Sequence, residues 1–110
     1  MDNIKNDAYY IEKLKTDLAF ICLHISGKTG EEFDNDEVLQ DSMMFRLIQI
    51  SENAKKVSDA FKAEHNDMPW ADVYGLRNRI VHEYGNVDMS IVYDTLLNDI
   101  PDFLRKLNGQ

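Results

Sequence analysis

Residues 75–85 hold the chain's densest group of side chains that can transfer protons or bind an anion. The group consists of Arg77, Asn78, Arg79, His82 and Tyr84. An arginine can bind two phosphate oxygens at once through its guanidinium, and a histidine gains and loses a proton near neutral pH. The combination therefore permits chemistry on a phosphate group without a metal ion.

A helical conformation would arrange these side chains on definite faces. Asn78 and His82 are four residues apart and would share one face. Arg77 and His82 would be separated by about 140° around the helix axis, a gap that the long arginine side chain partly closes. Gly85 follows Tyr84 and is expected to end the helix, because glycine readily adopts the left-handed conformation found there.

The same residues also allow a purely structural explanation. Arg77, Arg79 and Glu83 would suit a solvated helix surface, and His82 could satisfy a buried hydrogen bond, which is commoner than catalysis for a single histidine. Two features favour a functional site. The cationic cluster interrupts an acidic chain, and it lies near a helix end beside the phenol of Tyr84.

Cleavage of RNA by its own 2′-hydroxyl makes a further demand on such a site. The reaction needs a base on one side of the phosphorus, an acid on the other, and charge stabilisation between them. One His82 cannot act on both sides at once. A two-fold homodimer that places two copies of this helix face to face would supply two histidines and two copies of Arg77, and the sequence permits it.

Other chemistries lack their sequence motifs. The chain has no phosphate loop, no dinucleotide fingerprint and no serine nucleophile elbow. His82-Glu83 begins like a zinc protease helix, but Asn86 stands where the second histidine would be. His24 and His65 have no ligand spacing to His82 and are expected to be exposed, so we expect no metal and no cofactor.

The composition restricts the partners and the location. The 110 residues include 12 basic and 20 acidic side chains, a net charge of −8, so any RNA contact must come from a local patch and DNA binding is not expected. The single Cys22 excludes an internal disulfide and suits a reducing cytosol. No apolar run approaches the roughly 20 residues that span a bilayer. We expect one cytoplasmic domain covering residues 1–110.

Apolar residues recur at steps of three and four along most of the chain, which is typical of amphipathic helices. This periodicity predicts helices over residues 4–25 and 38–61 and a third that begins around Trp70 and carries the cationic cluster. A fourth, capped by Asp88, should be kinked or divided by Pro101. No segment alternates with a period of two. The prediction is an all-α, up-and-down bundle of four to five helices joined by short turns.

Capping signals mark the connection between the first two long helices. Thr29 with Glu32, and Asp34 with Glu37, each match the spacing of a capping box. The acidic side chains of this segment therefore suit helix N-termini better than a calcium loop, whose glycine and final glutamate are absent.

The spacing of Arg77, His82 and Tyr84, in the context Leu-Arg-Asn-Arg-Ile-Val-His-Glu-Tyr, resembles the signature of HEPN-domain toxins of the HepT type. The likeness extends over nearly the whole chain. It includes residues 50–55, the Met68-Pro69-Trp70 that precedes the motif, and residues 98–101 in the helix that follows it.

The resemblance implies a helical homodimer, or a higher assembly, that acts as a metal-independent endoribonuclease toxin. Arg77 would hold the scissile phosphate, His82 would be the acid or base, and Asn78 would orient the phosphate or the imidazole. Arg79 is a further candidate for substrate binding. Family members are usually paired with a small nucleotidyltransferase antitoxin, of the MntA type, that transfers AMP to the motif tyrosine, here Tyr84.

Added phosphates beside Arg77 and His82 would occupy the site and repel RNA. An alternative of another class is a non-catalytic helical interaction module that binds a nucleotidyltransferase or a nucleotide. In a purely structural bundle, by contrast, substitution of Arg77 or His82 would change stability alone.

Overall fold

The computed structural model describes residues 6–83 and 85–109, which form helices and contain no strand. In chain order the elements are α1 (Asp7–Ile25), α2 (Gly30–Asp34), α3 (Glu37–Lys55), α4 (Asp59–Glu64), α5 (Trp70–His82), α6 (Met89–Asp94), the π-helical turn η1 (Thr95–Asp99) and α7 (Ile100–Asn108). The four principal helices are α1, α3, α5 and the continuous segment α6–η1–α7. The predicted all-α fold is confirmed, with α2 and α4 as short additions.

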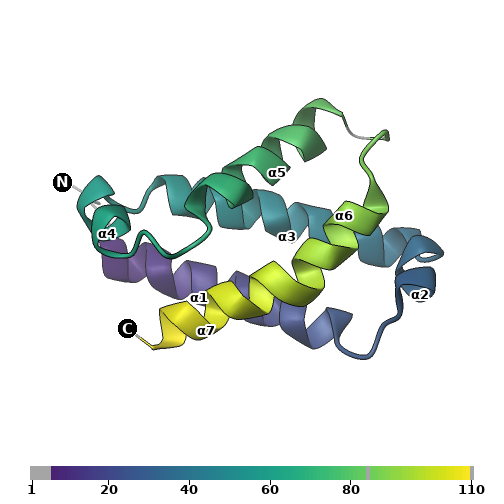
Figure 1. The fold of residues 1–110 in the computed structure, drawn as a ribbon, viewed down its shortest axis with the longest axis horizontal. Helices are drawn as coiled ribbons and strands as arrows, with labels where there is room; N and C mark the ends of the chain where they lie inside the picture. The colour runs from purple at the N-terminus through teal and green to yellow at the C-terminus, as the bar shows by residue number, and fades with distance from the viewer. Residues whose placement is uncertain (1–5, 84, 110) are drawn as a thin grey trace.

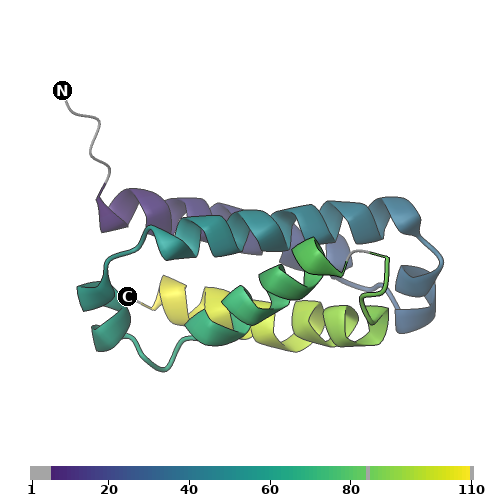
Figure 2. The same cartoon turned by 90° about the horizontal axis from the view of Figure 1, so that it is seen from above.

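The principal helices form two layers. One layer contains α1 and α3, and the other contains α5 and the segment α6–η1–α7 (Figure 1, Figure 2). The short helices α2 and α4 lie at opposite ends of the molecule. Helix α1 packs against both α3 and α7, while α5 packs against α3. Helix α5 is therefore positioned mainly by α3.

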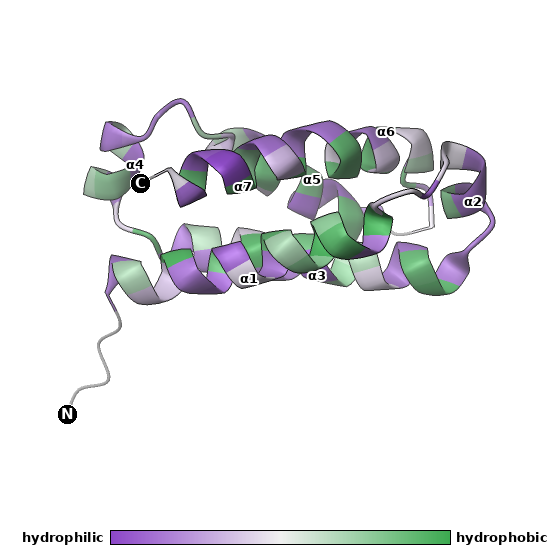
Figure 3. Ribbon diagram, turned by 90° about the horizontal axis from the view of Figure 1, so that it is seen from below, coloured by the Kyte–Doolittle hydropathy of each residue, from purple (hydrophilic) through white to green (hydrophobic). Residues whose placement is uncertain are grey.

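Apolar side chains form the core between the layers. Its fully enclosed side chains include Phe33, Phe103, Leu14, Leu18, Ile21, Met43, Ile50, Ile80 and Leu96. Hydrophilic and hydrophobic residues alternate around the helices, as expected when one side of each helix packs and the other meets water (Figure 3). No helix within residues 6–83 and 85–109 combines the length and apolar composition of a bilayer span.

The helix predicted over residues 38–61 is wrong in its extent, because the chain divides it in two. Helix α3 ends at Lys55, and α4 begins at Asp59 with Ser58 as its N-cap. The carboxylate of Asp7 accepts hydrogen bonds from the Ser58 backbone N–H at 2.8 Å and from its hydroxyl at 2.6 Å. Val57 is buried in the turn and keeps the apolar spacing that made the segment look continuous.

The capping signals were half correct. Thr29 and Glu32 form the predicted capping box at the start of α2. Asp34 and Glu37 do not form the second one, since Asp36 caps α3 by accepting from the Leu39 N–H. Asp34 instead ends α2, whose buried Phe33 ties this short helix to the core.

Of the two effects predicted for Pro101, a kink or a division, the division does not occur, because η1 continues directly into α7. A proline lacks the N–H of a helical hydrogen bond. Just before Pro101 the helix widens into η1, in which Ile100 donates its N–H to the Thr95 carbonyl five residues back. Asp88 caps the start of the segment as predicted, accepting from the Ser90 N–H at 2.9 Å.

Candidate functional site

The start of α5 is anchored by aromatic packing. Trp70 is 8% exposed, meets the Phe103 ring edge-on at 5.4 Å between centroids, and donates its indole N–H to the His65 carbonyl at 3.0 Å. Contrary to expectation His65 is half-buried, because its ring stacks on Phe61 at 4.0 Å. The predicted exposure of His24 is confirmed.

Arg77 lies on the side of α5 that faces α3. Its Nη2 is 3.1 Å from Oε1 of Glu52, and its Nη1 donates to Oδ1 of Asn78 at 3.2 Å. The Nε atom is sealed from solvent and has no hydrogen-bond partner among the described residues. The side chain as a whole remains 24% exposed, so Nε is enclosed while other atoms of the Arg77 side chain meet solvent.

His82 is the last residue of α5 and is exposed. Its ring makes no hydrogen bond to any described residue. Asn78, one turn earlier on the same face, is exposed as well. The helix ends as predicted near Gly85, whose φ of +95° is the left-handed conformation that glycine favours. One accessible edge of α5 thus carries Asn78 and His82, with Arg77 towards α3.

Tyr84, the predicted acceptor of AMP, lies outside the described residues. Gly85, the next residue in the chain, shows which part of the structure lies beside the end of the motif. Gly85 lines a cavity of about 410 Å³ together with Asp34, Asp41 and Met44. The chain after α5 therefore runs beside the beginning of α3, which means that α3 and α5 are antiparallel.

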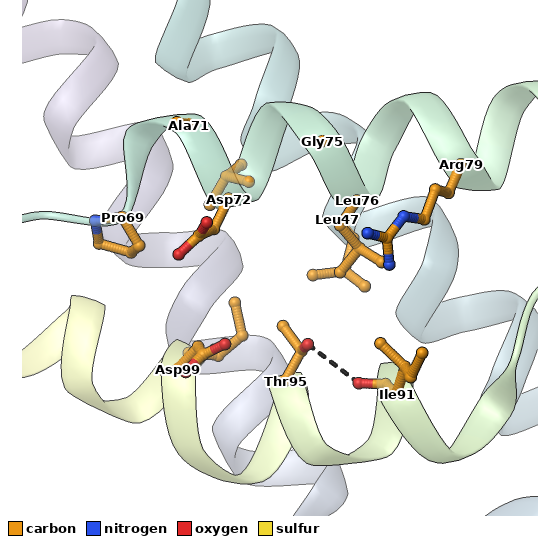
Figure 4. Close-up of a pocket in the computed structure, with 12 residues that line it drawn as sticks. Leu47, Pro69, Ala71, Asp72, Gly75, Leu76, Arg79, Ile91, Thr95 and Asp99 are labelled. Carbon is orange, nitrogen blue, oxygen red and sulfur yellow. Dashed lines mark hydrogen bonds between the residues drawn. The ribbon is translucent and has the colours of Figure 1, made fainter.

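Arg79 is separated from Arg77 by its position on the helix. Two residues correspond to about 200° of rotation, which directs Arg79 away from α3. It reaches over a groove of about 170 Å³ between α5 and the segment α6–η1, where Leu47, Leu76 and Ile91 supply the apolar lining (Figure 4). Arg79 makes no ion pair with any described residue. The helix therefore separates Arg79 from Arg77, although Arg79 lies only about 60° around the helix from His82, three residues further on.

The other end of this groove is acidic. Asp72 of α5 and Asp99 of η1 point towards each other across it (Figure 4). Burial raises the pKa of Asp99, and the nearby carboxylates of Asp72, Asp94 and Asp102 add to the effect. This end of the groove repels phosphate, so the groove is unsuited to RNA.

An exposed apolar strip flanks the Arg77 side of the molecule. Phe45 on α3 is 58% exposed, and Val81 on α5 is 44% exposed. Phe45 and Glu52 are seven residues apart and lie on the same side of α3. Val81 is one turn beyond Arg77. Because α3 and α5 are antiparallel, both apolar side chains lie in the same direction from the Glu52–Arg77 pair.

Sequence reasoning missed two charged residues of α3 that belong to this site. Glu52 also approaches Lys55, whose Nζ lies 3.7 Å from Oε1. Their three-residue spacing is that of an ordinary surface pair on a helix, and the segment 50–55 is part of the likeness to HepT-type toxins. Within the described residues, no three His, Cys, Asp or Glu side chains come together as metal ligands would.

The family model for Ribonuclease HepT-like proteins matches residues 14–108. This chain belongs to the HepT-like ribonuclease family. The match covers α1 from residue 14 onwards and all of the other principal helices, and it includes Glu52, Arg77 and His82. Ribonuclease activity is thereby supported at the level of the family.

Curated relatives of this HepT-like protein carry ribonuclease names. A "Putative RNase" of Caldanaerobacter subterraneus subsp. tengcongensis is 28% identical over 94% of this chain and 93% of its own. A "Probable ribonuclease HepT" of Thermococcus cleftensis is 28% identical over 96% of this chain and 89% of its own. A longer protein of Methanocaldococcus jannaschii is 25% identical over 88% of this chain, which spans 44% of it. No solved structure matches the chain significantly.

Proposed function

We propose that this chain is a metal-independent endoribonuclease toxin that acts as a homodimer, with residues 1–110 forming one helical domain. The observation that carries the proposal is the presence, on one helix of a HepT-like protein, of a partly buried arginine with a sealed Nε and an exposed histidine. Arg77 would bind the scissile phosphate, His82 would transfer protons, and Asn78 would orient the phosphate or the imidazole.

The reaction would proceed by attack of the RNA's own 2′-hydroxyl. A neutral His82 of one protomer would accept the 2′-hydroxyl proton while the oxygen forms its bond to phosphorus. The P–O5′ bond would break, and a protonated His82 of the second protomer would give its proton to the leaving oxygen. The products would be a 2′,3′-cyclic phosphate and a 5′-hydroxyl, with the guanidinium of Arg77 stabilising the charge on the phosphate.

The dimer would form through the α3 and α5 side of each protomer. Exposed Phe45 and Val81 provide apolar surface next to Arg77, and a two-fold axis there would bring together the two copies of α5. An interface at this place would also exclude water from the reacting phosphate. Arg79 lies about 200° from Arg77 around α5, so any contact of Arg79 with RNA would be separate from the phosphate contact of Arg77.

A nucleotidyltransferase antitoxin would silence the enzyme by transferring AMP to Tyr84. The added phosphate would lie two residues from His82 along the chain. It would compete with RNA for the cations of the site and repel the RNA backbone. This step is testable by comparing the activity of the protein before and after treatment with the partner enzyme and ATP, with Tyr84→Phe as the variant that cannot be modified.

The decisive experiment is cleavage of a labelled RNA by the purified protein in EDTA. Wild type would be compared with His82→Ala, and with Lys13→Ala as a control that removes one exposed charge from α1. Cleavage that needs His82 and leaves a 2′,3′-cyclic phosphate would support the nuclease. A folded dimer with unmodified Tyr84 that does not cleave would refute it and favour the non-catalytic interaction module.

A further inference from the structure

We infer that Glu52 of α3 is the positioning residue for Arg77, and that Lys55 keeps the site cationic despite this carboxylate. The inference rests on the proposed nuclease function and adds two α3 residues to the motif on α5. It follows from three features: the contact of Glu52 with Arg77, the sealing of Arg77 Nε from solvent, and the balance of charge.

The contact fixes one end of the guanidinium. Glu52 Oε1 lies 3.1 Å from Nη2 of Arg77, and on the opposite nitrogen Asn78 accepts from Nη1 at 3.2 Å. Arginine carries five N–H donors in a planar fork. Only the contact with Asn78 is a hydrogen bond, so the other terminal N–H groups are available to bind phosphate oxygens. Glu52 therefore orients the Arg77 guanidinium and leaves N–H donors available for the phosphate.

The pair is partly buried, with the Arg77 side chain 24% exposed and the Glu52 side chain 44% exposed. Arg77 Nε and Glu52 Oε1 are each sealed from solvent, although neither has a hydrogen bond of good geometry. The Glu52 contact is thus electrostatic in character. Without Glu52, the Arg77 side chain would be free to leave the α3–α5 seam and sample its rotamers in solvent.

The carboxylate of Glu52 repels phosphate, and the positive charge of Lys55 offsets this repulsion. Arg77 and Glu52 together are neutral. Lys55 Nζ approaches the same Oε1 at 3.7 Å, is half exposed, and brings the three side chains to a net charge of +1. A phosphate approaching Arg77 therefore meets a cationic cluster rather than a neutral pair.

This arrangement predicts an unusual separation of kcat and KM for Glu52→Ala. The loss of one negative charge strengthens the attraction of RNA, so KM should not rise and its salt dependence should become steeper. The loss of arginine order should lower kcat. The rotamer entropy of an arginine limits that fall to about thirtyfold, and we expect about tenfold. Glu52→Gln keeps the size of the side chain and one oxygen acceptor, so its kcat should fall less than that of Glu52→Ala.

A matched control is available on α1. Glu12 pairs with Lys15 at 3.5 Å with the same three-residue spacing as Glu52 and Lys55, but no arginine contacts it. Glu12→Ala should leave both kcat and KM unchanged. The Nε–H NMR signal of Arg77 gives a readout without turnover: it should exchange slowly with water in wild type and quickly in Glu52→Ala.

The outcomes separate the inference from the proposed function. A fall in kcat without a rise in KM, together with faster Nε–H exchange, supports Glu52 as the positioning residue. If wild type cleaves RNA and Glu52→Ala keeps or exceeds its kcat, the inference is wrong while the nuclease stands. If wild type does not cleave, the proposed function fails and the inference falls with it.

Discussion

The ion pair between Asp17 of α1 and Arg46 of α3 offers the sharpest test of the packing. Asp17 is 5% exposed, and its Oδ1 accepts from Nη1 of Arg46 at 2.7 Å. The guanidinium carbon also lies 3.7 Å from the centre of the Phe20 ring. Replacing Arg46 with methionine keeps an apolar stem over Phe20 but leaves the Asp17 carboxylate buried without its partner.

The expected cost of Arg46→Met is about 3 kcal/mol of unfolding free energy. Removing one partner of a buried ion pair costs about 3–5 kcal/mol. The lower end applies here because the Arg46 side chain is 25% exposed, so water reaches the pair. The cation–π contact with Phe20 is worth about 0.5–1 kcal/mol, most of which the methionine–aromatic contact replaces. At this chain length, 3 kcal/mol corresponds to roughly 12 °C in Tm.

The assay is urea unfolding followed by circular dichroism at one fixed protein concentration, since dimerisation would otherwise shift the midpoint. Asp17→Leu combined with Arg46→Met should return to within about 1 kcal/mol of wild type, because an apolar pair carries no desolvated charge. If Arg46→Met alone is as stable as the double variant, the buried Asp17 carboxylate carries no penalty for losing its partner, and the reasoning fails. Glu52→Ala, which breaks a half-exposed pair, should cost less than about 1 kcal/mol.

Three further predictions concern the interface, the helix end and the acidic groove. Phe45→Asp should dissociate the dimer in size-exclusion chromatography with light scattering. Leu23→Asp, which changes a still more exposed apolar residue on α1, should not, and a persisting dimer in Phe45→Asp would place the interface elsewhere. Gly85→Ala should cost about 1 kcal/mol in urea unfolding, because φ is +95° there, and no cost would mean that the turn relaxes. Asp99 has a raised pKa in the folded state, so its charge opposes folding increasingly as pH rises through that pKa. Asp99→Asn should therefore raise the urea midpoint at pH 7 and change it little near pH 3, and equal effects at both pH values would contradict the electrostatic origin.

Local patterns were sufficient to predict the principal helices. The three- and four-residue steps of apolar side chains mark the buried faces of α1 and α3, and Trp70 marks the start of α5. Thr29 and Asp88 act as caps because their partners lie within three residues of them. Such features depend on neighbours in the sequence, which is why they can be read from it.

The features that the sequence did not predict depend on contacts between distant residues. The break between α3 and α4 is stabilised by Asp7, which bonds to Ser58 across 51 positions of the chain. Nothing near Ser58 distinguishes it from a serine inside a helix. Similarly, Glu52 has the spacing of an ordinary surface pair with Lys55, and only the packing of α5 on α3 brings Arg77 to it.

Arg77 and Arg79 show why residue type alone does not define the site. Both are arginines of one short motif, yet one is enclosed by α3 and held by Glu52, while the other reaches over a groove whose far end is acidic. A phosphate gains most from a cation whose geometry is fixed before it arrives, because less side-chain entropy is then lost on binding. The functional unit we propose is therefore the seam between α3 and α5, with Glu52 as much a part of it as the arginine that it holds.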